Sequence, residues 1–263
     1  MVSVRRKSIP NSSDEFAVCR WLQRICGYLT EKELAELLRT ITHLRLVNNF
    51  QSGESRKSAS IDEISSTGMQ IVEILAELGG ARDALISGFL YPAVRAQIFS
   101  VPEIAEVFGE DIRELISGTL RMTLVSEYGR GGDIPILGQA ESPKDNIRHM
   151  LVAMIDDVRI ALIKLAERTV AMRKLKNSSR VVREAISQEV FDVYAPLADR
   201  LGVGHLKWEL EDLSFRYAQP DSYHRVAKLL DGKRTERDRY ILRVKHSLDE
   251  MLRAGGLRYE VTG

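Results

Sequence analysis

The chain has 263 residues, of which 44% are hydrophobic and only 6% aromatic. Lysine and arginine number 38 and aspartate and glutamate 37, so the overall charge indicates no polyanionic partner. Cys19 and Cys26 would lie about 10 Å apart along one helix, which excludes a disulfide between them there and favours a reducing compartment. The sequence contains no run of about 18 uncharged apolar residues and no apolar segment behind its basic N-terminus, so we expect a cytoplasmic protein without membrane attachment.

The first half of the chain is predicted to be helical after a loose N-terminal tail. An apolar stripe covers 13–29, and Thr30 with Glu33 predicts a capping box that begins a second helix ending near residue 48. A polar loop follows over 49–60. Further helices are predicted from Ile61 or Ser66 to Leu78, and over 81–89, 101–108 and 111–122.

Residues 128–143 carry four glycines and two prolines, which predicts a flexible loop. It is not a phosphate-binding loop, because the Gly-Lys-Ser/Thr ending is missing and no strand precedes it. Helices are then expected over 144–154, 157–176, 178–194, 206–217 and 222–253.

The last predicted helix is strongly charged and begins near Asp221, after Pro220. Gly255 and Gly256 end it, and residues 257–262 alternate like a strand. A lone strand has unpaired edges, so we interpret the chain as a fragment of a longer protein.

Basic side chains gather along two stretches, one around Lys164, Arg168 and Arg173 and the other on the last helix. Both are interleaved with carboxylates such as Glu167 and Glu236. We interpret them as solvated, salt-bridged helix surfaces and expect no direct binding of nucleic acid.

The segment over 191–217, FDVYAPLADRLGVGHLKWELEDLSFRY, combines Pro196, which interrupts or starts a helix, with Gly202 and Gly204, which offer left-handed turns. Together with DVRIALIKLAERTVAMRKL over 157–175, it resembles the RelA/SpoT family, whose members make and degrade (p)ppGpp. The resemblance extends from about residue 40 to the end of the chain.

The resemblance implies an all-α fold: an HD-domain-like helical bundle, followed by the first long helix and first strand of a truncated α/β synthetase domain. The implied divisions are N-terminal helices over 1–48, an inactive HD hydrolase-like domain over 49–200, an inter-domain linker helix over 201–220 and the start of the synthetase domain over 221–263.

The family's hydrolase pocket holds one divalent ion, typically manganese, with a histidine, a His-Asp pair and an aspartate from three helices, and a Glu-Asp pair helps to activate water. By resemblance, the corresponding positions here are Thr67 (or Ser65, if the gap is placed differently), Tyr91, Pro92, Arg95, Ala96, Glu167 and Ala171.

These residues do not supply the expected ligands. Tyr91-Pro92 stands in place of the His-Asp pair and Arg95-Ala96 in place of the Glu-Asp pair, and only Glu167 keeps a carboxylate. Because a single carboxylate cannot hold a catalytic divalent ion, we expect no metal, no cofactor and no hydrolase activity. Pro92 is also expected to bend or end its helix.

Loss of the hydrolase site is typical of the RelA-type branch, whose members transfer pyrophosphate from ATP to GTP or GDP. We therefore expect a regulatory, hydrolase-dead part of a bacterial GTP pyrophosphokinase of the stringent response. Its partner would be the rest of its own synthetase chain, and it would meet the ribosome only through C-terminal regions absent here. The alternatives are an active metal-dependent (p)ppGpp phosphohydrolase, or a non-catalytic guanine-nucleotide-binding module.

Overall fold

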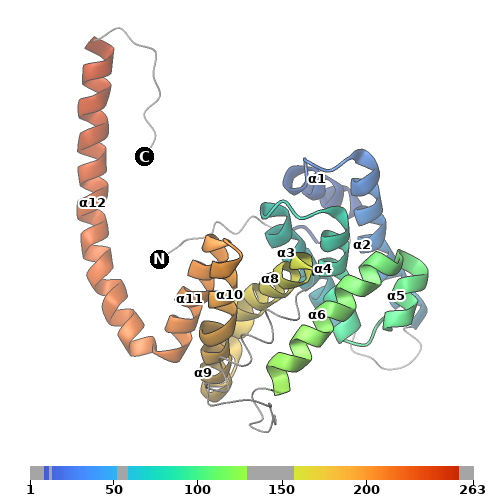
Figure 1. Ribbon diagram of the computed structural model, residues 1–263. Helices are drawn as coiled ribbons and strands as arrows, with labels where there is room; N and C mark the ends of the chain where they lie inside the picture. Colours follow the sequence, from blue (N-terminus) through green and yellow to red (C-terminus); the bar gives the residue numbers. More distant parts are fainter. Residues whose placement is uncertain (1–8, 12–13, 52–58, 129–156, 255–263) are drawn as a thin grey trace.

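The computed structural model describes residues 9–11, 14–51, 59–128 and 157–254. Every regular element within these segments is helical, which confirms the all-α prediction for the described part of the chain (Figure 1). The predicted helix over 144–154, the glycine-rich loop beyond Tyr128 and the strand over 257–262 lie outside the described residues. None of the described helices has the length and hydropathy needed to span a bilayer.

Both N-terminal helices begin at a side-chain cap, of which the sequence predicted the one at Thr30. Helix α1 (Glu15–Ile25) starts where the Asp14 carboxylate accepts from the backbone N–H of Ala17 at 2.9 Å. Helix α2 (Glu31–Gln51) starts at a capping box: the Thr30 N–H donates to Glu33 at 2.8 Å, and the Glu33 N–H donates to the Thr30 hydroxyl at 3.3 Å. Helix α2 ends at Gln51, slightly beyond the end that the sequence predicted near residue 48.

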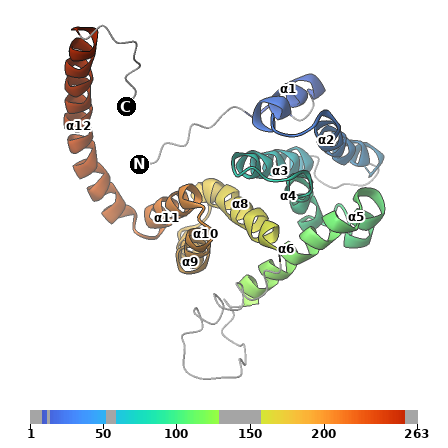
Figure 2. The same cartoon turned by 45° about the horizontal axis from the view of Figure 1, so that its top comes forward.

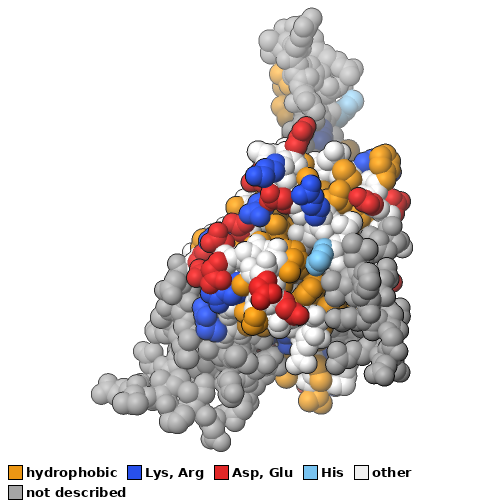
Figure 3. Space-filling model, turned by 90° about the vertical axis from the view of Figure 1, so that its right-hand side faces the viewer, with side chains coloured by type: hydrophobic (Ala, Val, Ile, Leu, Met, Phe, Trp, Pro, Cys, Tyr) orange, Lys and Arg blue, Asp and Glu red, His pale blue; other side chains and the backbone are white. Residues whose placement is uncertain are grey.

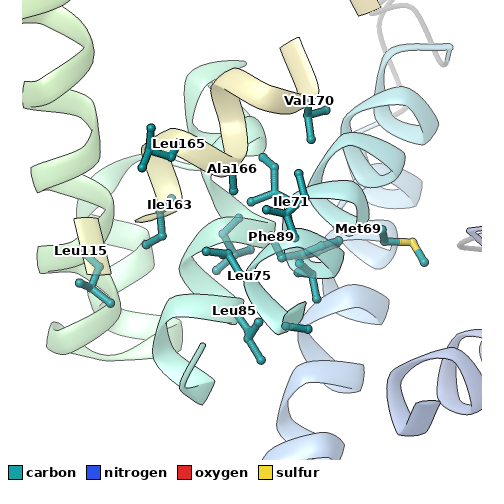
Figure 4. Packing of buried hydrophobic residues seen from close by; sticks show 14 of the residues in the cluster. Met69, Ile71, Leu75, Leu85, Phe89, Leu115, Ile163, Leu165, Ala166 and Val170 are labelled. Atoms are coloured by element: carbon teal, nitrogen blue, oxygen red, sulfur yellow. The ribbon is translucent and has the colours of Figure 1, made fainter. Parts of the chain in front are cut away.

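The centre of the bundle is the pair α3 (Ala59–Glu77) and α4 (Arg82–Arg95). Their backbones approach closely because glycines lie at the contact: a Cβ added at Gly68 would meet the Phe89 carbonyl oxygen at 2.5 Å. Helix α8 (Val158–Lys174) packs on this pair. Figure 4 shows buried side chains of all three helices meeting, among them Ile71, Phe89 and Ala166.

Helices α5 (Val101–Phe108) and α6 (Glu110–Tyr128) follow α4 and pack against each other. A capping box between Ser100 and Glu103 begins α5, and Gly109, with φ of 96°, allows the abrupt turn between the two helices. Helix α6 also packs on α4 and α8, so α4, α6 and α8 enclose one region of the core.

We expected Pro92 to bend or end its helix, and it does not end it. Helix α4 runs through Pro92 to Arg95, whereas the sequence pattern predicted an end near Phe89. A proline removes its own N–H donor and its ring crowds the preceding turn, but the buried Ala93 and Val94 that follow it hold the next turn in the core. The helix ends directly afterwards. Ala96 still donates to the Pro92 carbonyl, but Gln97 has φ of 59°, which is not a helical value.

The segment after α8 is more divided than predicted. The expected single helix over 178–194 is replaced by α9 (Arg180–Glu189) and a π-helical turn, η2 (Val190–Tyr194). A short 3-10 turn, η1 (Leu175–Asn177), precedes them. Helix α10 (Ala195–Arg200) then begins with Pro196 in its first turn, where a missing N–H costs nothing.

Helices α11 (Gly204–Ala218) and α12 (Pro220–Ala254) complete the described chain. Gly202 has φ of 71°, as predicted, but Gly204 simply begins α11 and does not have positive φ. Figure 2 shows α8 lying between the α3–α6 group and the α9–α11 group, with α12 extending away from both. Helix α12 confirms the predicted long charged helix.

The close approach of α3 and α4 gives a test of this packing. We expect Gly68→Ala to lower the free energy of unfolding by about 1–3 kcal/mol, because the new methyl group overlaps the backbone of Phe89. The matched control is Gly204→Ala, where an added Cβ has no neighbour within 4 Å. We expect that variant to be as stable as the parent or more stable by up to about 1 kcal/mol. Chemical denaturation measures both, and equal stability of the two variants would contradict the packing.

Candidate functional site

The sequence-predicted pocket positions lie on α3, α4 and α8 or directly after α4, and the structure brings only some of them together. Tyr91 is fully buried on α4, while Arg95 lies near Glu167 of α8, with 3.7 Å between their charged atoms. Thr67 of α3 accepts a hydrogen bond from Lys174 instead. The other three predicted positions carry no polar side chain. Pro92 is half-buried, Ala96 is exposed just past α4, and Ala171 is half-buried on α8.

A fully buried lysine occupies the space between Tyr91 and Glu167. The Lys164 ammonium donates to the Glu167 carboxylate at 2.8 Å and to the Thr123 hydroxyl of α6 at 2.8 Å. The Thr123 hydroxyl donates to the Thr119 carbonyl at 3.0 Å, so its one proton is already used. The Tyr91 hydroxyl, 2.6 Å from Thr123, must therefore be the donor in that contact.

Arg168 adds a second buried cation beside Glu167. Its Nε lies 3.7 Å from Glu167, its Nη2 lies 3.7 Å from Glu189, and its guanidinium sits 5.2 Å from the centre of the Tyr194 ring. The charges thus alternate through the cluster, and the aromatic face gives further cation–π stabilisation. We call Tyr91, Thr123, Lys164, Glu167, Arg168, Glu189 and Tyr194 the Lys164 cluster.

The π-helical turn η2 explains how Glu189 and Tyr194 both reach Arg168. Residues five apart on an ideal α-helix point about 140° away from each other. In η2 the backbone N–H of Ala195 donates to the carbonyl of Val190, an i to i+5 bond that widens the turn. The wider turn rotates Tyr194 back toward the side of the helix that carries Glu189.

Burial and charge set the protonation of the central pair. Burial lowers the pKa of Lys164 to about 8, and Arg168 and Arg95 act in the same direction while Glu167 opposes them. Burial acts to raise the pKa of Glu167, but the positive charges of Lys164, Arg168 and Arg95 outweigh it and hold that pKa below its ordinary value. Glu167 is therefore an ionised carboxylate surrounded by cations.

These residues do not fit a divalent metal ion. The carboxylate of Glu167 is already bound by an ammonium and flanked by two guanidinium groups, whose charges would repel a metal. Tyr91 is no substitute ligand, because burial and the charge of Glu167 raise the pKa of its phenol well above the usual range. Within the described residues, no group of three or more His, Cys, Asp or Glu is placed to hold a metal.

The sequence interpretation of the basic stretch on α8 was wrong for two of its members. Lys164 has no exposed surface and Arg168 only 5%, whereas a solvated helix surface was expected. Arg173 is also largely covered, because it makes a two-pronged ion pair with Glu209 of α11 at 2.6 and 2.8 Å. The signal that could have revealed this was that the charged residues of α8 do not gather on one face of the helix, as they would on a solvated surface.

Comparisons with known proteins agree with the fold. The HD domain family matches residues 44–204. The GTP pyrophosphokinase of Photobacterium angustum is 40% identical over 196 residues, which are 74% of this chain and 26% of that protein. The GTP pyrophosphokinase of Escherichia coli K12 is 34% identical over 263 residues, which are 100% of this chain and 34% of that protein.

A third relative carries a different name. The probable guanosine-3′,5′-bis(diphosphate) 3′-pyrophosphohydrolase of a Synechocystis species is 35% identical over 189 residues, which are 72% of this chain and 24% of that protein. The chain therefore spans about a third or less of the length of these relatives.

Removing the buried ammonium tests the role of the Lys164 cluster in stability. We expect Lys164→Met to lower the free energy of unfolding by about 3 kcal/mol, the lower end of the cost of breaking a buried ion pair, because Arg95 and Arg168 still face Glu167. The exposed Lys32→Met on α2 is the control and should change stability little. The double variant Lys164→Met/Glu167→Met should recover much of the loss.

The same variants should show a characteristic pH dependence. The pKa of Lys164 is about 8 in the folded protein and 10.5 in the unfolded chain, so the unfolded state binds more protons between these values. The parent should thus gain stability relative to Lys164→Met as pH rises from 8 to 10.5. Urea titrations at each pH measure the difference, and a constant difference would mean that the ammonium is solvated.

Proposed function

Because the chain belongs to the RelA/SpoT family, we propose that it is the hydrolase-like part of a RelA-type GTP pyrophosphokinase in which (p)ppGpp hydrolysis has been lost. Two relatives named GTP pyrophosphokinase support the branch, and the Escherichia coli K12 protein aligns with the whole chain. In this proposal the longer protein transfers pyrophosphate from ATP to GTP or GDP, and its hydrolase-like part takes no chemical step.

The binding of Glu167 by Lys164 is the observation that carries the loss of hydrolysis. Hydrolysis of a pyrophosphate ester by a metal enzyme needs an ion that lowers the pKa of water and offsets phosphate charge. By resemblance, Glu167 takes the position of a metal-ligating aspartate, and Tyr91 that of a ligating histidine. In this chain the carboxylate is neutralised by an internal ammonium at 2.8 Å, and the phenol stays protonated. The position therefore serves packing and charge balance.

We assign the domain a regulatory role toward the remainder of its own chain. Support comes from the connection between the Lys164 cluster and the helices that lead to α12. Helix α8 contacts η2 through Arg168 and α11 through the Arg173–Glu209 ion pair. Helix α11 then holds the start of α12, because the Tyr223 hydroxyl accepts from Arg216 at 2.9 Å. This chain of contacts supports the proposal, in which a change at one end alters the contacts at the other.

That regulatory role is tested in the full-length protein with Arg173→Gln, which breaks the link between α8 and α11. We expect the rate of (p)ppGpp synthesis, basal or stimulated, to change, because the synthetase then lacks its restraint. The matched control is Arg113→Gln, whose ion pairs with Glu110 and Glu114 stay within α6, and it should leave the rate unchanged. Unaltered synthesis in Arg173→Gln that is still folded by circular dichroism would argue against the coupling.

The Synechocystis relative favours a second candidate, an active pyrophosphohydrolase, and one assay separates the two. We expect the chain, incubated with ppGpp and Mn²⁺, to release no pyrophosphate above a protein-free blank, while the Synechocystis protein serves as the positive control. We also expect the electron paramagnetic resonance signal of free Mn²⁺ to be undiminished by the chain. Pyrophosphate release by the chain would overturn the proposal, and ppGpp binding without release would instead support a nucleotide-binding module.

A further inference from the structure

A half-open pocket of about 260 Å³ lies between α2, α4 and the α5–α6 turn. The side of the molecule that carries α2 and α5 faces the viewer in Figure 3, and hydrophobic side chains lie there beside acidic and basic ones. The pocket is separate from the Lys164 cluster. Its Ile86 points about 140° away from Tyr91 on α4, and its Ile112 lies about 16 Å along α6 from Thr123.

The inner part of the pocket is apolar and well supported. Ile86 and Ile112 are each only 2% exposed. Phe108 meets the His43 ring edge-on at 5.8 Å, and both rings pack against Phe99, each with 6.2 Å between ring centres. These three rings hold one another in place, so the wall formed by Phe108 and His43 is preorganised to receive another apolar body.

The rim of the pocket carries one unbalanced positive charge. Arg82 is neutralised, because it pairs with Glu36 and also with Asp83 at 2.7 Å. The Thr40 hydroxyl donates to the Glu36 carbonyl at 2.9 Å. Arg39 is exposed at the rim, and its guanidinium makes no hydrogen bond or ion pair with any residue in the described segments. The lining therefore combines apolar walls with one available planar cation.

We propose that this pocket binds a small amphiphilic anion, a single apolar ring or short chain that bears a carboxylate or a phosphate. The guanidinium of Arg39 offers two parallel N–H donors, which match both kinds of anion. The apolar body would lie against Ile86, Phe108 and Ile112. At 260 Å³ the pocket falls just below the range of drug-sized sites, which are about 300–1,000 Å³, and so selects a compact ligand. The proposal does not depend on the loss of hydrolase activity.

The test uses the whole chain with ¹³C-labelled isoleucine methyl groups, because Ile86 and Ile112 report from inside the pocket. Benzoate and phenyl phosphate carry both a ring and an anionic group, whereas inorganic phosphate carries only charge and phenol only the ring. We expect saturable shifts of the Ile86 and Ile112 methyl signals with benzoate or phenyl phosphate, and weaker binding of the other two probes. Comparing the two ring-bearing anions decides between carboxylate and phosphate.

Arg39→Gln is the decisive variant, and Arg24→Gln on α1, which is also exposed, is its matched control. Arg39→Gln removes the solvent-exposed charge pair between residue 39 and the bound anion, so it should raise the Kd of the preferred anion about fivefold. Arg24→Gln should leave that Kd unchanged. The Ile86 and Ile112 signals of the free variants show whether each is still folded. The proposal is overturned if no probe gives a saturable shift, if phenol binds as tightly as the anions, or if Arg39→Gln binds like the parent.

Discussion

The contact between the Lys164 ammonium and the Glu167 carboxylate, both removed from water, joins the buried charges at the centre of this bundle. Taking two ions out of water is costly, and the cost is recovered only if each finds good partners. Lys164 finds Thr123 and Glu167, and Glu167 finds two further cations nearby. Because these partners come from α4, α6 and α8, the pair fixes the relative placement of three helices that apolar packing alone would leave less specified.

The same cluster extends beyond the core through Arg168. Its contacts with Glu189 and Tyr194 depend on the π-helical turn, a local geometry that survives only where surrounding contacts favour it. The junction of α8, η2 and α11 is therefore held by charge and ring contacts as well as by apolar burial. Such a junction ties α8 to η2 and α11, which suits a domain proposed to transmit its state to neighbouring segments of a longer chain.

Local rules predicted most of the helices, but they did not predict the site. The capping box at Thr30 and the long charged helix α12 follow from nearest-neighbour chemistry, and both appear in the structure. The burial of Lys164 depends on which faces of α8 are covered by α4 and α6, and charge interleaving along one helix cannot show that. The turn η2 also escaped prediction, because its residues are compatible with an ordinary α-helix and only the partners of Arg168 favour the wider turn.

The retention of a carboxylate at Glu167 has a physical explanation that does not involve catalysis. If metal binding were the sole reason for a carboxylate at position 167, its proposed loss would allow a neutral residue there. Lys164 and Arg168 would then be left as buried cations without the nearest anion, which costs more than an apolar replacement of the whole cluster. A carboxylate in such a position is therefore held by its neighbours. Its presence among buried cations indicates charge balance, and only a set of unprotonated, uncompensated ligands would indicate a metal.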